Sequence, residues 1–224
     1  DIDVSEEAGV RYLHFGSDWV QGAMRIARPW NLELAYTREM MAGLLLRQET
    51  PWPRHTLLIG LGAGSLTKYI YRHLPQTRIT VLEINPEVEL VARFHFTLPQ
   101  DPARLTIHID DGAAFMAASQ EQYDLILVDG FDPDARAGGL DTAPFYQHCR
   151  ERLTADGLLS INLLGRNRGF AASAERLRQA FDGRALVFPS CDSGNAIAFA
   201  ASGNPVAVGL DELRSRAETL KRET

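Results

Sequence analysis

The sequence predicts an α/β fold, in which helices cover both faces of a mostly parallel, seven-stranded sheet. Two observations carry this prediction. Short apolar runs alternate with segments of helical periodicity over residues 56–200, and repeated β-α units of this kind form parallel sheets. Four of the apolar runs also end in glycine or in an acidic residue. This places polar groups at the carboxyl edge of the sheet, where such folds bind their ligands.

The N-terminal segment is predicted to be a short β hairpin element covering residues 1–30. Aromatic and apolar residues alternate there with polar ones, most clearly over 10–28, as is typical of paired strands. Residues 31–224 are predicted to form one Rossmann-like catalytic domain that binds a nucleoside. Its first helix is expected at 34–48, where apolar residues recur at helical spacing before Pro51.

Strands and helices are then expected in alternation. The predicted strands are 56–60, 78–83, 105–109, 123–128, 158–164, 185–188 and 196–200. The predicted helices are 66–74, a helix that begins at Asn85-Pro86, 112–119, about 141–153, 171–181 and 210–222. The last two strands are joined by a short polar segment, so an antiparallel hairpin at one edge of the sheet is expected.

Composition excludes several classes of protein. The 224 residues carry a formal net charge of −6, which gives no basic surface for nucleic acid. No stretch approaches the ~20 apolar residues of a membrane span. Cys149 and Cys191 are too few for a disulfide framework, and neither they nor the six histidines show metal-ligand spacing. We expect a cytoplasmic protein with no metal, no nucleic-acid partner and no membrane partner.

Three glycines and one glutamate form the most informative motif. Gly60, Gly62 and Gly64 follow an apolar strand and precede a helix, and Glu83 ends the next apolar strand. Glycines there let the backbone approach a ligand closely, and an acid at the end of the second strand can accept hydrogen bonds from ribose hydroxyls. The spacing is G-x-G-x-G, whereas dinucleotide enzymes have G-x-G-x-x-G. An adenosine-type ligand with a sulfonium is therefore favoured over NAD.

Asp111 and Gly112 follow the third strand of this series. A carboxylate at that edge can accept a hydrogen bond from an adenine amino group. An Asp directly before a helix can equally well be its N-cap, and the two roles are compatible.

Two further carboxylates follow the fourth strand. Asp129 and Asp132 form the segment D-G-F-D-P, and two acids on one loop can hold a protonated amine and remove its proton. Crowding raises the pKa of one of two neighbouring acids, which suits a base near neutral pH. A simple Asp-Pro turn explains Asp132, but it explains less well why Asp129 directly follows an apolar strand.

These motifs resemble those of the polyamine synthase family, the spermidine and spermine synthases. Members of that family are aminopropyltransferases with the class I methyltransferase fold. The family's glycine stretch matches residues 60–65, its ribose acid Glu83, its adenine-side D-G Asp111-Gly112 and its catalytic D-x-x-D-P loop residues 129–133. The resemblance covers about residues 9–164 and extends to Gln21, Leu140, Phe145 and Tyr146.

Two positions depart from the family pattern. The aspartate of the family's glycine stretch is Ala63 here, and the family's Tyr-His-Glu-Met, which helps to bind the amine acceptor, is represented only by Tyr36-Thr-Arg-Glu39-Met40. Tyr36 is the substrate-binding residue that the resemblance implies. Both departures remove groups that handle cationic amines.

The resemblance implies transfer of an aminopropyl group from decarboxylated S-adenosylmethionine to an amine or polyamine. The predicted catalytic residues are Asp129 and Asp132. The predicted co-substrate site consists of Gln21, Gly60, Gly62, Gly64, Glu83, Asp111 and Gly112. The alternatives are a methyltransferase that uses intact S-adenosylmethionine and a nucleoside-binding relative without catalysis. The expected partners are a small-molecule amine and a second copy of the chain in a homodimer.

Overall fold

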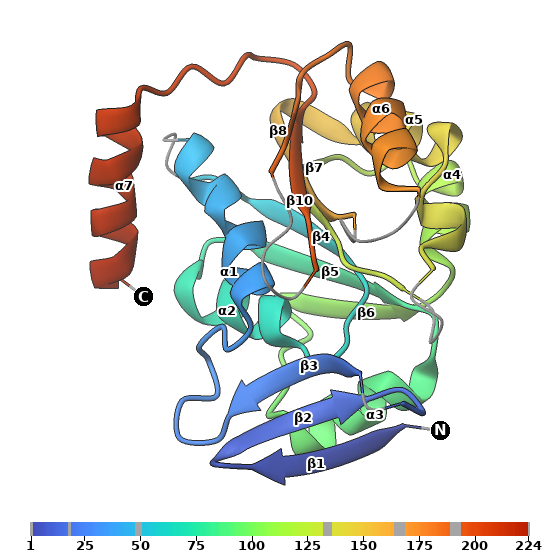
Figure 1. The fold of residues 1–224 in the computed structure, drawn as a ribbon, viewed down its shortest axis with the longest axis vertical. Helices are drawn as coiled ribbons and strands as arrows, with labels where there is room; N and C mark the ends of the chain where they lie inside the picture. The colour runs from blue at the N-terminus through green and yellow to red at the C-terminus, as the bar shows by residue number, and fades with distance from the viewer. Residues whose placement is uncertain are drawn as a thin grey trace.

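The computed structural model describes residues 2–17, 19–47, 51–131, 136–163, 169–188 and 194–223. A small antiparallel sheet lies at one end of a larger sheet that helices flank on both faces (Figure 1). No helix in these described ranges is both long and apolar enough to cross a membrane.

The large sheet has seven strands in the order β6-β5-β4-β7-β8-β10-β9. Strands β4 to β8 are parallel, whereas β10 runs antiparallel to both β8 and β9. The bounds are β4 His55–Ile59, β5 Arg78–Glu83, β6 Leu105–Ile109, β7 Tyr123–Val128, β8 Leu153–Asn162, β9 Ala185–Val187 and β10 Ile197–Ala201. The sequence-based prediction of a mostly parallel seven-stranded sheet is confirmed.

Side-chain alternation along the strands divides the core between two helical layers. Leu58 faces one layer, whereas its neighbours Leu57 and Ile59 face the other, as the two-residue period of a strand requires. The first layer contains α1 Ala35–Met41, α2 Ser65–His73 and α3 Pro86–His95. The second contains α4 Gly112–Ala118, α5 Ala143–Glu151 and α6 Phe170–Ala180.

The chain reverses its direction of travel across the large sheet between β4 and β7. From β4 it moves outward through β5 to β6, and it then returns to place β7 on the other side of β4. Ligands of open α/β sheets bind at such a switch point, beyond the carboxyl ends of the strands. The carboxyl ends of β4, β5 and β7 carry Gly60, Glu83 and Asp129.

The N-terminal sheet has three strands, one more than the predicted hairpin. They are β1 Asp3–Glu7, β2 Val10–His14 and β3 Val20–Arg25. Leu13 and Met24 from this sheet pack against Ala63 and Phe96 in a small apolar cluster. The small sheet is thereby held against the glycine-rich turn that follows β4.

Two 3-10 helices were not expected from the sequence, whereas the last helix lies close to its predicted range. The helix predicted at 34–48 is α1 followed by a 3-10 helix, η1 Ala42–Leu46, and a second 3-10 helix, η2 Gly138–Leu140, precedes α5. The predicted last helix is α7 Leu210–Glu223, which carries no buried residue. Its Arg216 Nη1 donates to the carbonyl of Leu45 in η1 at 2.6 Å.

Candidate active site

A cavity of about 550 Å³ opens at the carboxyl edge of the large sheet. Most of the residues predicted from the sequence line it together: Gln21, Tyr36, Gly60, Gly62, Glu83, Asp111, Gly112 and Asp129. Gly64 is not among the lining residues. It caps α2 with a φ of 69°, and a Cβ there would lie 2.9 Å from Leu98 Cδ1. Asp132 lies outside the described residues.

Gly60, which follows β4, lies close to the main chain that follows β7. Its φ is 98°, and a Cβ there would lie only 2.2 Å from the carbonyl oxygen of Asp129. Strand pairing holds this approach, because Asp129 N donates to Ile59 O at 2.9 Å. Only glycine meets both the steric and the conformational requirement.

Main-chain donors hold the carboxylate of Glu83. Its Oε2 accepts from Leu61 N at 2.9 Å and its Oε1 from Asn85 N at 3.0 Å. The side chain is 8% exposed and lines the cavity. A carboxylate oxygen has more than one lone pair, so each oxygen can accept a further hydrogen bond from a ligand hydroxyl.

Asp111 is the N-cap of α4. Its Oδ1 accepts from Ala114 N at 2.8 Å. The capping role considered from the sequence is therefore present, and the residue also lines the cavity. The adenine contact stays a prediction.

Asp129 lies at the centre of a network of side-chain hydrogen bonds. Its Oδ2 accepts from Tyr36 OH at 2.9 Å, and its Oδ1 accepts from Asn162 Nδ2 at 3.1 Å. The same Asn162 nitrogen donates to Asn195 Oδ1 at 2.7 Å. Side chains from α1 and β8 thus meet at the carboxylate that follows β7, and Asn195, in the segment before β10, joins the network through Asn162.

Burial and hydrogen bonding act in opposite directions on this carboxyl group. Burial raises the pKa of Asp129, and the hydrogen bonds from Asn162 and Tyr36 partly offset that rise. The pKa of Tyr36 is also raised well above its usual value, by burial and then by the charge of Asp129. Tyr36 therefore stays protonated and donates a hydrogen bond to Asp129.

Sequence reasoning missed Asn162 and Asn195. Both line the cavity, and Asn162 is only 5% exposed. The one available signal was a polar residue within the apolar run predicted at 158–164. An asparagine near the end of a strand is too common for that signal to have been specific.

The N-terminal sheet forms one wall of the cavity through Gln21 and Gly22 of β3. A Cβ on Gly22 would lie 2.6 Å from the Cβ of Ala63. Ala63 is only 2% exposed. Ala63, one of the two departures from the family pattern noted in the sequence, is therefore packed tightly against this sheet.

The part of the chain that the structure describes contains no group of three or more His, Cys, Asp or Glu side chains arranged to hold a metal ion. The described lining supplies carboxylates, neutral amides, hydroxyls, a phenol, the guanidinium of Arg136 and backbone groups. Such a set binds hydroxyl and amine ligands and can accept a proton.

The fold and this cavity define the class of protein. The strand order, with β10 reversed among the seven described strands, is that of the class I methyltransferase fold. The chain belongs to the spermine/spermidine synthase domain family, whose model matches residues 33–163.

A curated relative agrees with this family, and two solved structures share the fold. The chain is 37% identical over 220 residues to a polyamine aminopropyltransferase of Neisseria meningitidis serogroup A. The aligned region covers 98% of this chain and 83% of that protein. A probable spermidine synthase from Corynebacterium glutamicum superposes with a TM-score of 0.80 at 21% identity. The superposition covers 99% of this chain and 82% of that one. Human methyltransferase-like protein 13, solved in complex with SAH, gives a TM-score of 0.75 at 26% identity, covering 85% and 92%.

Proposed function

We propose that this protein transfers the aminopropyl group of decarboxylated S-adenosylmethionine to an amine. The observation that carries the proposal is the carboxylate of Asp129, which lines the cavity and is held by Tyr36 and Asn162. Its raised pKa brings it closer to that of a base that works near neutral pH. The name of the Neisseria relative supports the same activity.

In the proposed reaction, Asp129 accepts the proton that the nucleophilic amine must lose. The amine nitrogen forms a bond to the methylene carbon attached to the sulfonium, and the bond between that carbon and sulfur breaks. Its electron pair returns to sulfur, so methylthioadenosine leaves as a neutral thioether. Holding nitrogen, carbon and sulfur in line contributes much of the rate. Asp132, expected to help, lies outside the described residues.

The adenosine part of the donor is proposed to bind between the glycine turn and the ends of β5 and β6. Glu83 accepts hydrogen bonds from the ribose hydroxyls, since its two oxygens are fixed by main-chain donors and line the cavity. Asp111 and Gly112 lie beside the adenine. Gln21 closes the site from β3.

One observation favours a second candidate, a methyltransferase that uses intact S-adenosylmethionine. Ala63 contributes no carboxylate to the glycine turn. The methionine carboxylate of the intact donor would therefore meet less repulsion there. The effect of such a charge is on the order of 1 kcal/mol in a partly solvated cleft, so discrimination between the two donors is expected to be weak.

Product analysis separates the two candidates. The protein is incubated with 1,4-diaminobutane and, in parallel, with decarboxylated or intact S-adenosylmethionine. We expect methylthioadenosine and an aminopropylated amine from the decarboxylated donor. S-Adenosylhomocysteine formed from the intact donor would establish the methyltransferase instead. Absence of both products across a panel of amines would contradict both.

Calorimetric titration of the two donors and of methylthioadenosine tests the binding step alone. A preference for the decarboxylated donor above a thousandfold would contradict our account of Ala63. Ala63→Asp is a poor test of that account, because the new carboxylate would have to fit against Gly22. The expected homodimer stays a prediction, which light scattering coupled to size exclusion can test.

A further inference from the structure

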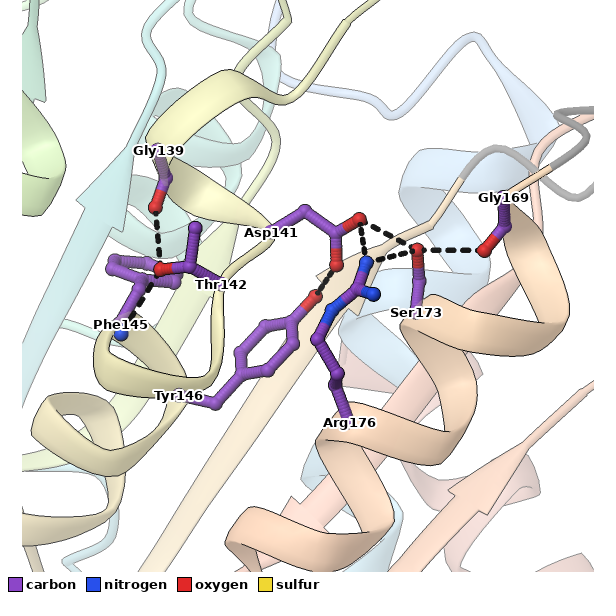
Figure 2. A network of polar contacts seen from close by, with 8 residues as sticks. All are labelled: Gly139, Asp141, Thr142, Phe145, Tyr146, Gly169, Ser173 and Arg176. Atoms are coloured by element: carbon purple, nitrogen blue, oxygen red, sulfur yellow. Dashed lines mark hydrogen bonds and ion pairs between the residues drawn. The ribbon is translucent and has the colours of Figure 1, made fainter.

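A second polar network lies beside the cavity, where α5 and α6 begin, and the proposed reaction does not use it (Figure 2). We name it the Asp141 cluster; its members are Asp141, Tyr146, Ser173 and Arg176. Asp141 Oδ1 accepts from Tyr146 OH at 2.6 Å. Its Oδ2 lies 2.6 Å from Ser173 Oγ and 2.5 Å from Arg176 Nη2.

Two of the four members of this cluster are shielded from water, whereas the side chains of Asp141 and Arg176 are 24% and 35% exposed. Tyr146 is 0% exposed and Ser173 is 5% exposed. Burial and the neighbouring Asp141 raise the pKa of Tyr146. Its hydroxyl therefore stays protonated and donates a hydrogen bond to Asp141. Removing a carboxylate that accepts from several donors is costly, because the donors lose their partner together.

The cluster fixes the end of a segment that forms part of the cavity wall. Gly138, Gly139 and Leu140 of η2 line the cavity, and Asp141 follows them directly. The next residue adds a second tie, since Thr142 Oγ1 donates to Gly139 O at 3.2 Å and accepts from Phe145 N at 3.3 Å.

Leu140 links this wall to two other cavity residues. A Cβ on Gly130 would lie 2.6 Å from Leu140 Cδ1, and one on Gly112 would lie 3.2 Å from Leu140 Cδ2. The Leu140 side chain therefore packs against the residue after Asp129 and against the first residue of α4. A shift of η2 would therefore disturb the cavity wall both at Gly130, beside Asp129, and at Gly112, beside Asp111.

We propose that Asp141 is a positioning residue, which ties η2 to α6 and so holds Leu140 between Gly112 and Gly130. Its effect on the ligand rests on the proposed function, whereas its effect on the wall does not. The competing explanation is that Asp141 only joins α5 to α6. A matched control exists for that explanation: Arg150 Nη2 and Asp182 Oδ2, 2.5 Å apart, join the same two helices at their opposite ends.

The first experiment measures the wall without a ligand. Hydrogen exchange is followed in Asp141→Asn and in the control Asp182→Asn. We expect faster exchange at residues 138–142 and 112–114 in Asp141→Asn only. Unchanged exchange in a folded Asp141→Asn, or the same acceleration at both segments in Asp182→Asn, would overturn the proposal.

The second experiment measures ligand binding and turnover. Asp141→Asn is expected to raise the Kd for methylthioadenosine and the KM for the donor by about tenfold, with kcat within about threefold, because a displaced wall weakens binding while Asp129 keeps its own partners. A purely structural role would lower Tm and leave Kd unchanged in the folded protein. Failure of the wild type to bind methylthioadenosine would instead contradict the proposed function, and the exchange experiment would still decide the role of Asp141.

Two further variants keep the test decisive if Asp141→Asn folds poorly. Ser173→Ala removes one partner and leaves Tyr146 and Arg176 in contact with Asp141, so a smaller change in the same direction is expected. Arg176→Met combined with Asp141→Asn should cost less than the sum of the two single changes, as coupled residues do. Additive effects, or a Ser173→Ala protein with wild-type exchange at 138–142, would contradict the cluster's role.

Discussion

The two halves of the cavity hold their carboxylates by different means. At the ends of β4 and β5, both oxygens of Glu83 accept from main-chain N–H groups. At the end of β7, the oxygens of Asp129 accept from the side chains of Tyr36 and Asn162. A carboxylate held by the backbone moves only when the strands move. One held by side chains can be adjusted by single substitutions that leave the backbone intact.

This difference predicts that binding and chemistry can be perturbed separately. The backbone-held half should govern affinity for the nucleoside, and the side-chain-held half should govern turnover and its dependence on pH. A variant that changed both together would break the comparison.

The largest effect is expected from Asp129→Asn. Loss of a general base lowers turnover by about 10²-fold or more, while affinity for methylthioadenosine should stay nearly intact because Glu83 and the glycine turn are untouched. Steady-state kinetics and calorimetry on the same preparation check this. Turnover close to that of the wild type would mean that the loop after β7 is only a turn.

Gly60→Ala tests the point where the two halves touch. The new Cβ would lie 2.2 Å from Asp129 O at a φ of 98°. We expect the free energy of unfolding to fall by more than about 2 kcal/mol, from strain and from separation of β4 and β7. Gly9→Ala is the control, since Gly9 has a φ of 76° and nothing within 4 Å of an added Cβ. Equal losses in urea unfolding would show that the contact with Asp129 adds nothing.

Glu83→Ala should weaken methylthioadenosine binding by about 1–3 kcal/mol, which is typical for the loss of hydrogen bonds to a charged group. Turnover at saturating donor should change much less. Glu87→Ala, on the exposed first turn of α3, serves as the control. Unchanged affinity in a folded Glu83→Ala protein would remove this residue from the site.

The smallest effect concerns the acidic side of the pH profile. Turnover needs ionised Asp129, so it should fall as pH drops through the raised pKa of that group. Tyr36 lowers the pKa of Asp129 by donating to it. Tyr36→Phe should therefore move the acidic limb of kcat to higher pH and leave the plateau above it in place. A limb at the wild-type position would show that Tyr36 does not tune the base.

The sequence was most informative where a polar residue ends an apolar strand. Glu83 and Asp129 were found in this way, and both line one cavity. The sequence pattern did not distinguish a glycine that lines the cavity from one that only shapes the backbone. Gly64 belongs to the G-x-G-x-G pattern, yet it faces Leu98, because its positive φ is needed to start α2.

The missed features have weak local signals. Strand β1 is mostly exposed and polar, so it lacks the alternation that identified β2 and β3. The predicted strand at 158–164 omitted the first residues of β8, since Thr154 to Gly157 look like a turn. The pairing of β7 with β8 is irregular there. Asn195 precedes β10 and is linked to Asp129 through Asn162, a relation that exists only in the folded chain.

The order in which the strands leave the ribosome differs from their order in the sheet. Among the seven described strands of the large sheet, β10 comes last along the chain, yet it lies between β8 and β9. Until it pairs, β8 has an open edge, and Asn195, which lies just before β10, is not yet held beside Asn162. Long-range pairings of this kind form slowly, and open edges are sites of aggregation during folding. A nascent chain that stalls before residue 197 would thus expose a sheet edge next to an unfinished active site.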